Sequence, residues 1–111
     1  MSERDDLLDE VWDDWRESVT MAPKELERWL ETDESRRVGD GDGGESTGHR
    51  SGRRIVTILR TRKDDLTLDD VRWMQKVVGF VHRHLAQRPT GDVEGSDWRY
   101  SLMNWGHDPL A

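Results

Sequence analysis

The sequence predicts an all-α protein, a single small bundle of about five helices, from three observations. Apolar residues recur at helical spacing in several stretches, which are bounded by cap residues or by proline. Six tryptophans supply large apolar area to a chain that is only 32% hydrophobic and 37% charged. A length of 111 residues suits one hydrophobic core, so we expect one domain spanning residues 1–111.

The first two predicted helices lie in the acidic N-terminal part of the chain. Ser2, with Asp5 three residues later, forms a variant of the capping box, and an apolar stripe follows for about four turns. That stripe consists of Leu8, Val11, Trp12, Trp15 and Val19. Pro23 suits the first position of the second helix, which should end near Thr32. Its apolar face consists of Leu26, Trp29 and Leu30.

A glycine-rich loop and a basic helix are predicted next. Residues 33–52 contain six glycines and almost no apolar side chain, which predicts a long flexible loop, with Ser51 as the cap of the following helix. The stretch Arg50–Lys63 has helical periodicity, although the β-branched run 55–58 leaves a strand as the alternative. One face of the helix consists of Ile55, Ile58, Leu59 and Arg62. The opposite face consists of Arg53, Thr57, Arg60 and Thr61.

Two further helices are predicted in the C-terminal half. Thr67 and Asp70 form a capping box, and Leu66 with Val71 forms the matching hydrophobic staple. The helix continues for about five turns until Pro89 forbids its continuation. Its apolar face consists of Val71, Met74, Val77, Val78, Val81 and Leu85. A short final helix is indicated by Trp98, Leu102, Trp105 and the capping Gly106.

Charge is distributed unevenly along the chain, whose net charge is −7. Residues 1–34 carry a net charge of −9, whereas residues 35–63 carry +5. The overall acidity disfavours non-specific binding of nucleic acid, but a local basic stretch attracts phosphate within a Debye length of about 8–10 Å. The middle segment is therefore the predicted site for a polyanion.

The basic segment is the strongest candidate for a binding site. Glycines lead into a predicted helix start, and helix N-termini attract phosphate oxygens. The cluster at this start consists of His49, Arg50, Arg53 and Arg54. Arginine adds forked hydrogen bonds to phosphates or to guanine edges. The alternative is that these arginines pair with the acidic first helix and leave no accessible patch. The predicted nucleic-acid contacts are Arg50, Arg53, Arg54, Arg60, Arg62 and Lys63.

Aromatic residues offer one further candidate. Five of the six tryptophans fall on apolar helical faces, where packing in the core is the expected role. Trp73 lies off the main apolar stripe of its helix. It is the predicted residue for a surface or protein-interaction role.

Other classes of site lack the residues that they need. The absence of cysteine excludes disulfides and thiol nucleophiles. His82 and His84 point to different faces of a helix and are not expected to share a metal ion. Asp40 and Asp42 resemble the opening of a calcium loop, but Ser51 stands where that loop needs glutamate. We expect no catalytic residue, metal, cofactor or small-molecule substrate.

The N-terminal residues are acidic and lack the basic flank and apolar run of a signal peptide. No stretch approaches the roughly 20 apolar residues of a membrane span. We expect an intracellular, cytoplasmic protein that does not contact a membrane.

Five motifs spread over most of the chain resemble the small domain-of-unknown-function family 3140. They are KELERWL (Lys24–Leu30), SGRRIVTIL (Ser51–Leu59), KDDLT (Lys63–Thr67), HRHLAQRP (His82–Pro89) and WRYSLMNWGHDP (Trp98–Pro109). The resemblance implies no mechanism and no set of functional residues, although some members carry a DNA-binding label. Ala22 departs from the hydroxyl cap expected before the second helix, and Pro23 offsets part of the lost cap energy of about 1 kcal/mol.

Two functional hypotheses follow from these patterns. The first is a small non-enzymatic DNA-associated protein, in which the basic segment contacts phosphates and the acidic first helix limits non-specific binding. The second is a protein-interaction or self-associating accessory domain without nucleic-acid binding, in which acidic and basic faces pair between copies or with a protein partner.

Overall fold

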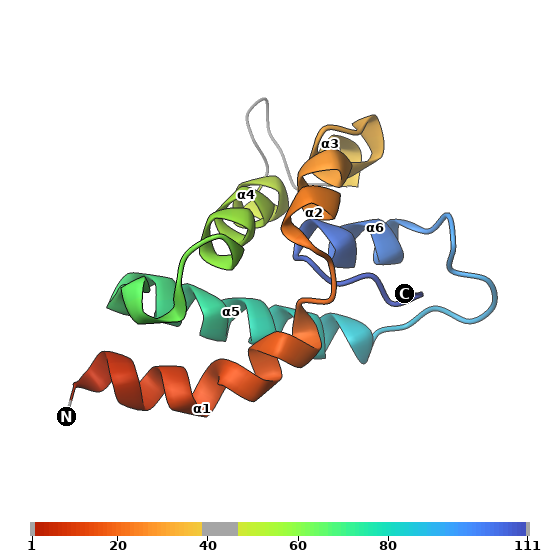
Figure 1. Cartoon of the computed structure of the whole chain (residues 1–111). Helices are drawn as coiled ribbons and strands as arrows, with labels where there is room; N and C mark the ends of the chain where they lie inside the picture. Colours follow the sequence, from red (N-terminus) through yellow and green to blue (C-terminus); the bar gives the residue numbers. More distant parts are fainter. Residues whose placement is uncertain (1, 39–46, 111) are drawn as a thin grey trace.

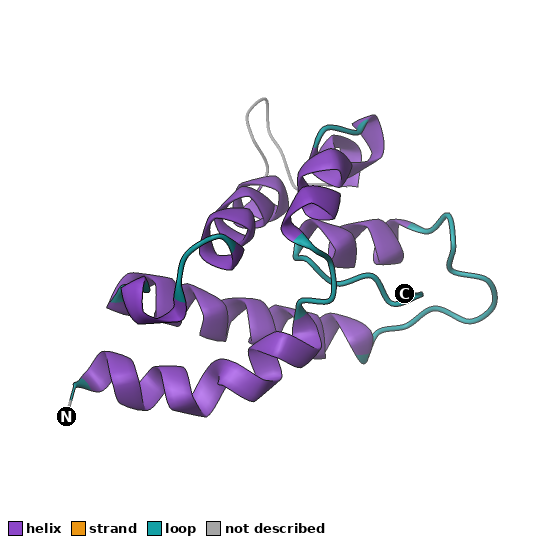
Figure 2. Ribbon diagram, viewed as in Figure 1, coloured by secondary structure: helices purple, strands orange, loops and turns teal. Residues whose placement is uncertain are grey.

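The computed structural model describes residues 2–38 and 47–110, which form helices and their connections, the longest of them between α5 and α6, without a strand (Figures 1 and 2). The elements are α1 (Glu3–Ser18), α2 (Pro23–Leu30), α3 (Asp33–Val38), α4 (Thr47–Leu59), the 3₁₀ helix η1 (Lys63–Asp65), α5 (Leu68–Leu85) and α6 (Asp97–Asn104). The predicted all-α bundle is confirmed for this part of the chain.

The helices form two groups. Along the bottom of Figure 1, α1 and α5 lie side by side and run in the same direction. Arg4 holds the two starts together, because its guanidinium donates hydrogen bonds to the carbonyls of Leu66 (2.7 Å) and Lys63 (2.6 Å), just before α5. In the other group, α2 packs along α4, and α3 packs along α6.

One hydrophobic core joins the two groups. Side chains with almost no exposed surface come from both, among them Leu26, Ile55, Val71, Met74, Val77, Val81 and Leu102. The predicted core tryptophans Trp15, Trp98 and Trp105 are buried, whereas Trp12 and Trp29 are partly buried and pack against the edge of the core. Because each aromatic ring buries about 150–250 Å², these residues build a core from few side chains.

Local capping fixes helix starts as the sequence predicts. The Ser2 hydroxyl accepts a hydrogen bond in the first turn of α1. At α5, the Thr67 hydroxyl accepts from the backbone N–H of Asp70 at 3.1 Å, and the Asp70 carboxylate accepts from the backbone N–H of Thr67 at 3.0 Å. The staple residues Leu66 and Val71 are both buried. The capping box and the staple are thus confirmed.

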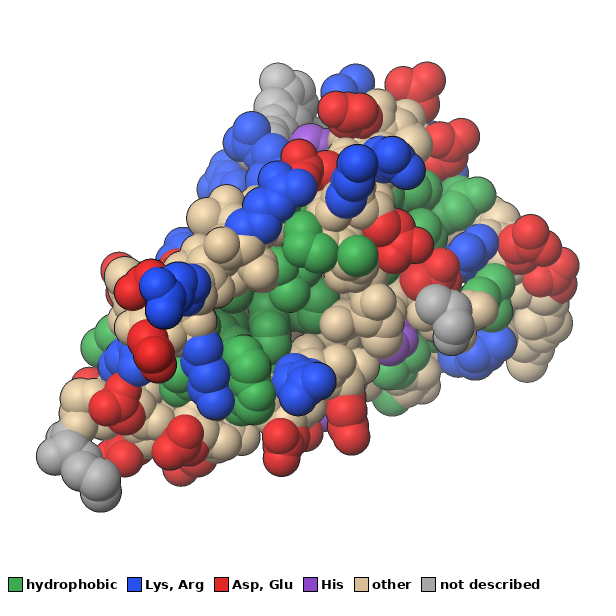
Figure 3. Space-filling model, viewed as in Figure 1, with side chains coloured by type: hydrophobic (Ala, Val, Ile, Leu, Met, Phe, Trp, Pro, Cys, Tyr) green, Lys and Arg blue, Asp and Glu red, His purple; other side chains and the backbone are tan. Residues whose placement is uncertain are grey.

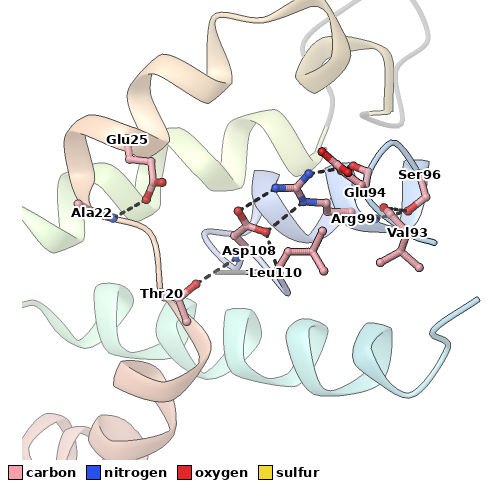
Figure 4. Close-up of polar contacts among 9 residues, drawn as sticks. All are labelled: Thr20, Ala22, Glu25, Val93, Glu94, Ser96, Arg99, Asp108 and Leu110. Atoms are coloured by element: carbon pink, nitrogen blue, oxygen red, sulfur yellow. Dashed lines mark hydrogen bonds and ion pairs between the residues drawn. The ribbon is translucent and has the colours of Figure 1, made fainter. Parts of the chain in front are cut away.

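The start of α2 lacks a hydroxyl cap, as the sequence indicates. Ala22 offers no side-chain acceptor, and Pro23 occupies the first helical position. The Glu25 carboxylate instead accepts a hydrogen bond from the backbone N–H of Ala22 at 3.3 Å (Figure 4). A proline at this position loses no helical hydrogen bond, which compensates for the missing cap.

The structure corrects the predicted loop of residues 33–52 at its beginning. Residues 33–38 form α3, which starts where the Thr32 hydroxyl accepts a hydrogen bond from the backbone N–H of Ser35 at 3.1 Å. Ser35 is completely buried, and its hydroxyl donates a hydrogen bond to Asn104 of α6. This buried contact holds the short helix in place.

The predicted loop is also wrong at its end. The helix α4 begins at Thr47, and Ser51, the predicted cap, is buried inside it. Packing requires glycine at position 52 of this helix, because a Cβ on this residue would lie 2.6 Å from Leu30 Cδ2. The middle of the predicted loop, residues 39–46, lies outside the described residues.

The segment after α6 folds back onto the connection between α1 and α2. Gly106 has a φ of 82°, a conformation that favours glycine, which confirms its predicted role as the cap. Its carbonyl accepts hydrogen bonds from the backbone N–H groups of Thr20 (2.9 Å) and Met21 (3.1 Å). Nearby, the Arg99 guanidinium donates two hydrogen bonds of 3.1 Å to the Asp108 carboxylate (Figure 4).

Candidate nucleic-acid interface

Packing of α4 turns its basic side chains outward. Gly52, Ile55 and Ile58 are buried, chiefly against α2 and also near α5 and α6. A helix that buries one side exposes positions three and four residues apart on the other. The exposed side, which we call the basic face, consists of Arg50, Arg53, Arg54, Thr57 and Arg60, the last directly after α4.

Acidic and basic side chains occupy different parts of the molecule. Figure 3 shows Lys and Arg side chains gathered over α4, whereas Asp and Glu side chains lie along the lower edge over α1. The ion pairs that the basic face forms with described residues reach α5 and α2. These ion pairs do not involve α1. They therefore do not support the predicted alternative, in which the arginines pair with the first helix.

Arg54 lies at the boundary between α4 and α5. Its Nη2 atom is 3.5 Å from Asp70 Oδ1, and its guanidinium carbon is 4.9 Å from the centre of the Trp73 ring. Lys76 Nζ lies 4.8 Å from the centre of the same ring. Trp73, the predicted interaction residue, is thus partly buried and contacted by two cations. These contacts restrict the orientation of Arg54, whose side chain is still 38% exposed.

Arg60 lies at the opposite boundary, between α4 and α2. Its guanidinium forms an ion pair with Glu27, and the two side chains are 53% and 44% exposed. Exposed ion pairs of this kind contribute only about 0–1 kcal/mol. Separation of Arg60 from Glu27 therefore costs little free energy.

The last two predicted contacts lie beyond α4. The predicted helix over residues 50–63 ends at Leu59, so Arg62 lies in the following turn and Lys63 begins η1. Lys63 Nζ is 4.2 Å from the centre of the Trp12 ring. Arg62 is exposed and forms no ion pair within the described part of the chain. These two residues extend the positive surface past the end of α4 rather than along its side.

The predicted phosphate site at a helix start needs a correction. Because α4 begins at Thr47, Arg53 and Arg54 lie in the middle of the helix, where backbone N–H groups bond to preceding carbonyls. His49 Nε2 donates a hydrogen bond of 2.6 Å to the carbonyl of Leu30 in α2. Arg53 and Arg54 therefore offer hydrogen-bond donors from their side chains and not from free backbone N–H groups.

Two depressions border Arg53. One, of about 410 Å³, lies between α2 and α4 and is lined in part by Glu27, Glu31 and Arg53. The other, of about 520 Å³, is wide open and lies on the basic face itself, where Arg50, Arg53, Arg54 and Thr57 line it together with Asp70 of α5. Because Arg53 lines both, it stands on the ridge that separates them.

Shifted pKa values occur in the described residues outside the basic face. Burial lowers the pKa of His84 in α5, and the hydrogen bond from Arg4 lowers the pKa of Asp5 in α1. The hydrogen bonds that Arg99 donates to the Asp108 carboxylate raise the pKa of Arg99. Each shift has a cause in packing or in an ion pair of the fold.

Membrane-spanning helices and metal sites are absent from the described ranges. No helix there combines the length and the apolar surface needed to cross a bilayer. No three His, Asp or Glu side chains there are grouped so that they could hold a metal ion.

Comparison with known proteins gives a family and no further relative. No curated protein and no solved structure matches the chain. The sequence profile of a family described as protein of unknown function (DUF3140) matches residues 14–103. The matched range runs from the second half of α1 into α6 and includes the basic face and Trp73. Because the match covers most of its length, this chain belongs to the DUF3140 family.

Proposed function

We propose that this protein binds duplex DNA through the basic face of α4 and acts as a binding protein without catalysis. The observation that carries this proposal is a row of four arginines, three exposed and Arg54 partly exposed, along one side of α4 and the residue directly after it. Positive side chains that lie close together bind the phosphate backbone and release its counterions. The neighbouring Arg62 and Lys63 extend the same positive surface.

The intramolecular contacts of the basic face support this role. Arg54 and Arg60 each interact with one carboxylate while they remain partly exposed. A carboxylate partner orients the guanidinium in the free protein and can give way to a phosphate, which carries more acceptor oxygens. In this proposal, the ion pairs with Asp70 and Glu27 keep the arginines ordered before DNA arrives.

The acidic helix α1 restricts the side of the protein from which DNA could bind. It carries eight acidic residues and packs chiefly along α5, so its charge lies away from the outer side of α4. DNA that approaches from the side of α1 is repelled, whereas DNA that approaches α4 is attracted. The proposed binding is therefore confined to one orientation, and the negative charge of α1 weakens non-specific contacts with DNA.

A salt titration of duplex binding, measured by fluorescence anisotropy, tests the proposal. The logarithm of the binding constant should fall linearly with the logarithm of salt concentration, with a slope of about −0.9 for each phosphate contact. The double variant Arg54→Ala/Arg60→Ala should bind more weakly and should reduce this slope by about 2 units. Absence of binding by the unmodified protein at low salt would contradict the proposal.

A matched control separates local contacts from net charge. Arg16 on α1 and Arg83 on α5 are exposed and lie outside the basic face. The double variant Arg16→Ala/Arg83→Ala removes the same charge as the test variant and should keep the original salt slope. An equal loss of affinity in both double variants would show that overall charge, rather than the basic face, determines binding.

A self-associating accessory domain is the second candidate function. The observation in its favour is the separation of the acidic α1 from the basic α4 in one molecule, which allows the two surfaces to pair between copies. Light scattering at low and high salt tests this candidate. A larger mass at low salt that falls to the monomer at high salt would support it, and a monomer at every salt concentration would remove it.

A further inference from the structure

We infer that α4 enters the major groove of B-form DNA, with Arg50, Arg53 and Thr57 facing the edges of the bases. This inference rests on the proposed function and specifies how the same surface would recognise its partner. It predicts that binding depends on the contents of the major groove and on base sequence, which phosphate contacts alone would not require.

The shape around α4 is the first argument. Arg53 stands on a ridge between two depressions, one toward α2 and one that Arg50, Arg54 and Thr57 line together with Asp70 of α5. A helix that lies in the major groove has one phosphate backbone on each side of it. The depressions toward α2 and α5 provide space for these two backbones while the ridge reaches the bases.

The length and composition of the ridge are the second argument. The 13 residues of α4 span about 20 Å, and the major groove, about 12 Å wide, admits an α-helix. Arg50 and Arg53 are long enough to place two donors on the O6 and N7 atoms of guanine. The short Thr57 side chain lies one turn further and lets the helix backbone approach the bases.

The positions of Arg54 and Arg60 are the third argument. Arg54 is held by Asp70 and Trp73 on the side of α5, and Arg60 is paired with Glu27 on the side of α2. The two arginines therefore border the ridge on opposite sides. This is where the flanking phosphates would lie, so Arg54 and Arg60 would contact backbone and set the position of the helix.

Other modes of binding fit the surface less well. The minor groove, about 6 Å wide, does not admit a helix. Single strands are bound by stacking of bases on exposed aromatic rings. The ring beside the basic face, Trp73, is partly buried and covered by Arg54 and Lys76. Duplex DNA read through its major groove is therefore the partner that the geometry favours.

Modified DNA tests the groove directly with the complete protein. A duplex in which cytosines carry glucosylated 5-hydroxymethyl groups has an obstructed major groove and an unchanged backbone charge. Binding to it should be at least about tenfold weaker than to the plain duplex of the same sequence, as expected when base contacts are lost. Saturation of the plain duplex with netropsin, a minor-groove ligand, should leave binding unchanged.

The outcomes distinguish this inference from the proposed function. Equal binding to plain and glucosylated duplexes would overturn the major-groove inference and leave phosphate binding intact. Competition by netropsin would also overturn it. No binding to either duplex would remove the proposed function itself.

Sequence preference provides an independent test. Duplexes selected by the protein from a random pool should contain guanines, and the variant Arg50→Lys should lose at least about tenfold in preference for the selected sequence. Its affinity for unselected duplex should change little, because the charge remains. Arg16→Lys on α1 is the matched control. An unchanged preference in Arg50→Lys would exclude base contact by this residue.

Discussion

Gly52 of α4 lies so close to Leu30 of α2 that a Cβ atom on Gly52 would stand 2.6 Å from Leu30 Cδ2. The same Cβ would lie 2.6 Å from the carbonyl oxygen of Asn104 at the end of α6. The backbone of Asn104 and the buried side chain of Leu30 prevent α4 from packing at any other distance from α2 and α6. This contact therefore determines how far the opposite side of α4, the basic face, projects from the molecule.

Substitution Gly52→Ala should destabilise the protein. Alanine favours a helix over glycine by about 1 kcal/mol, but overpacking against backbone costs more, typically about 1–3 kcal/mol. We expect a net loss in the free energy of unfolding, measured by urea denaturation. The control is Gly79→Ala in α5, where the nearest atom is the flexible end of Arg83 at 3.2 Å. A gain in stability from Gly52→Ala equal to that of the control would contradict the packing argument.

Asn104 should be required for the position of α3. Its Oδ1 atom accepts hydrogen bonds from Trp29 Nε1, at 2.8 Å, and from the Ser35 hydroxyl, while its Nδ2 donates to the carbonyl of Ser35 at 3.0 Å. In Asn104→Ala these buried groups lose their partner, which costs about 1–3 kcal/mol. Hydrogen exchange should become faster in α3, whereas the partly buried Ser101→Ala should leave it unchanged. Equal protection of α3 in both variants would exclude this role.

The helices that could be predicted from sequence are those with local determinants. The start of α5 depends on Thr67 and Asp70, which are three residues apart and bond to each other. The local signal for α3 was also present in the sequence, because Thr32 is a helix cap, but six glycines nearby favoured a loop. Local chemistry therefore predicts an element only where neighbouring residues do not favour another structure.

The beginning of α4 could not be predicted in the same way. Gly48 and Gly52 are typical of loops, yet both lie in the helix. A Cβ on Gly48 would make only ordinary van der Waals contacts of 3.5 Å with Asn104 and Trp105, whereas a Cβ on Gly52 would lie 2.6 Å from the carbonyl oxygen of Asn104, a residue more than 50 positions away, so packing requires glycine at position 52. Such requirements follow from tertiary contacts and have no local signal.

The same distinction applies to the candidate site. The spacing of Arg53, Thr57 and Arg60 placed them on one helical face, and the structure shows all three exposed. The contacts of Arg54 with Asp70 and Trp73 join two helices, so spacing within α4 could not reveal them. The sequence thus predicts which residues share a surface, and only the packing of helices shows what borders it.

Asp108 should make the protein sensitive to strong acid. Burial raises the pKa of its carboxyl, but hydrogen bonds from Arg99 and from the backbone of Leu110 outweigh this effect, so its pKa is lowered. A carboxyl whose pKa is lower in the folded state stabilises the fold above its unfolded pKa of about 3.9, and this contribution is lost as pH falls through the folded value. Asp108→Asn should lower stability at pH 7 by about 1–3 kcal/mol.

The acid dependence of Asp108 can be measured by urea denaturation at pH 6 and at pH 3. Asp108→Asn should lose less stability than the unmodified protein between these pH values, because the titrating group is gone. Asp13, exposed on α1, provides the control substitution Asp13→Asn. A pH dependence in Asp108→Asn identical to that of the control would mean that the Arg99–Asp108 pair does not carry this stability.

His84 should make the stability of the protein fall in mild acid. Its ring stacks between Phe80 and Trp98, its Nε2 atom is buried without a partner among the described residues, and burial lowers its pKa. The unfolded chain therefore takes up a proton near pH 6.5, before the folded protein does. Stability is complete above this pH and declines below it, by about 1.36 kcal/mol for each unit by which the two pKa values differ, until the folded protein is also protonated.

The difference in unfolding free energy between pH 7.5 and pH 5 measures this contribution of His84. His84→Gln disturbs the stacking and should lower stability at both pH values, but it should reduce the difference between them, because glutamine does not titrate. His82→Gln, at an exposed position two residues earlier, should retain the full difference. If His84→Gln retained it as well, the neutral ring of His84 would not be the source of the pH dependence, and burial of its Nε2 atom would have no energetic consequence.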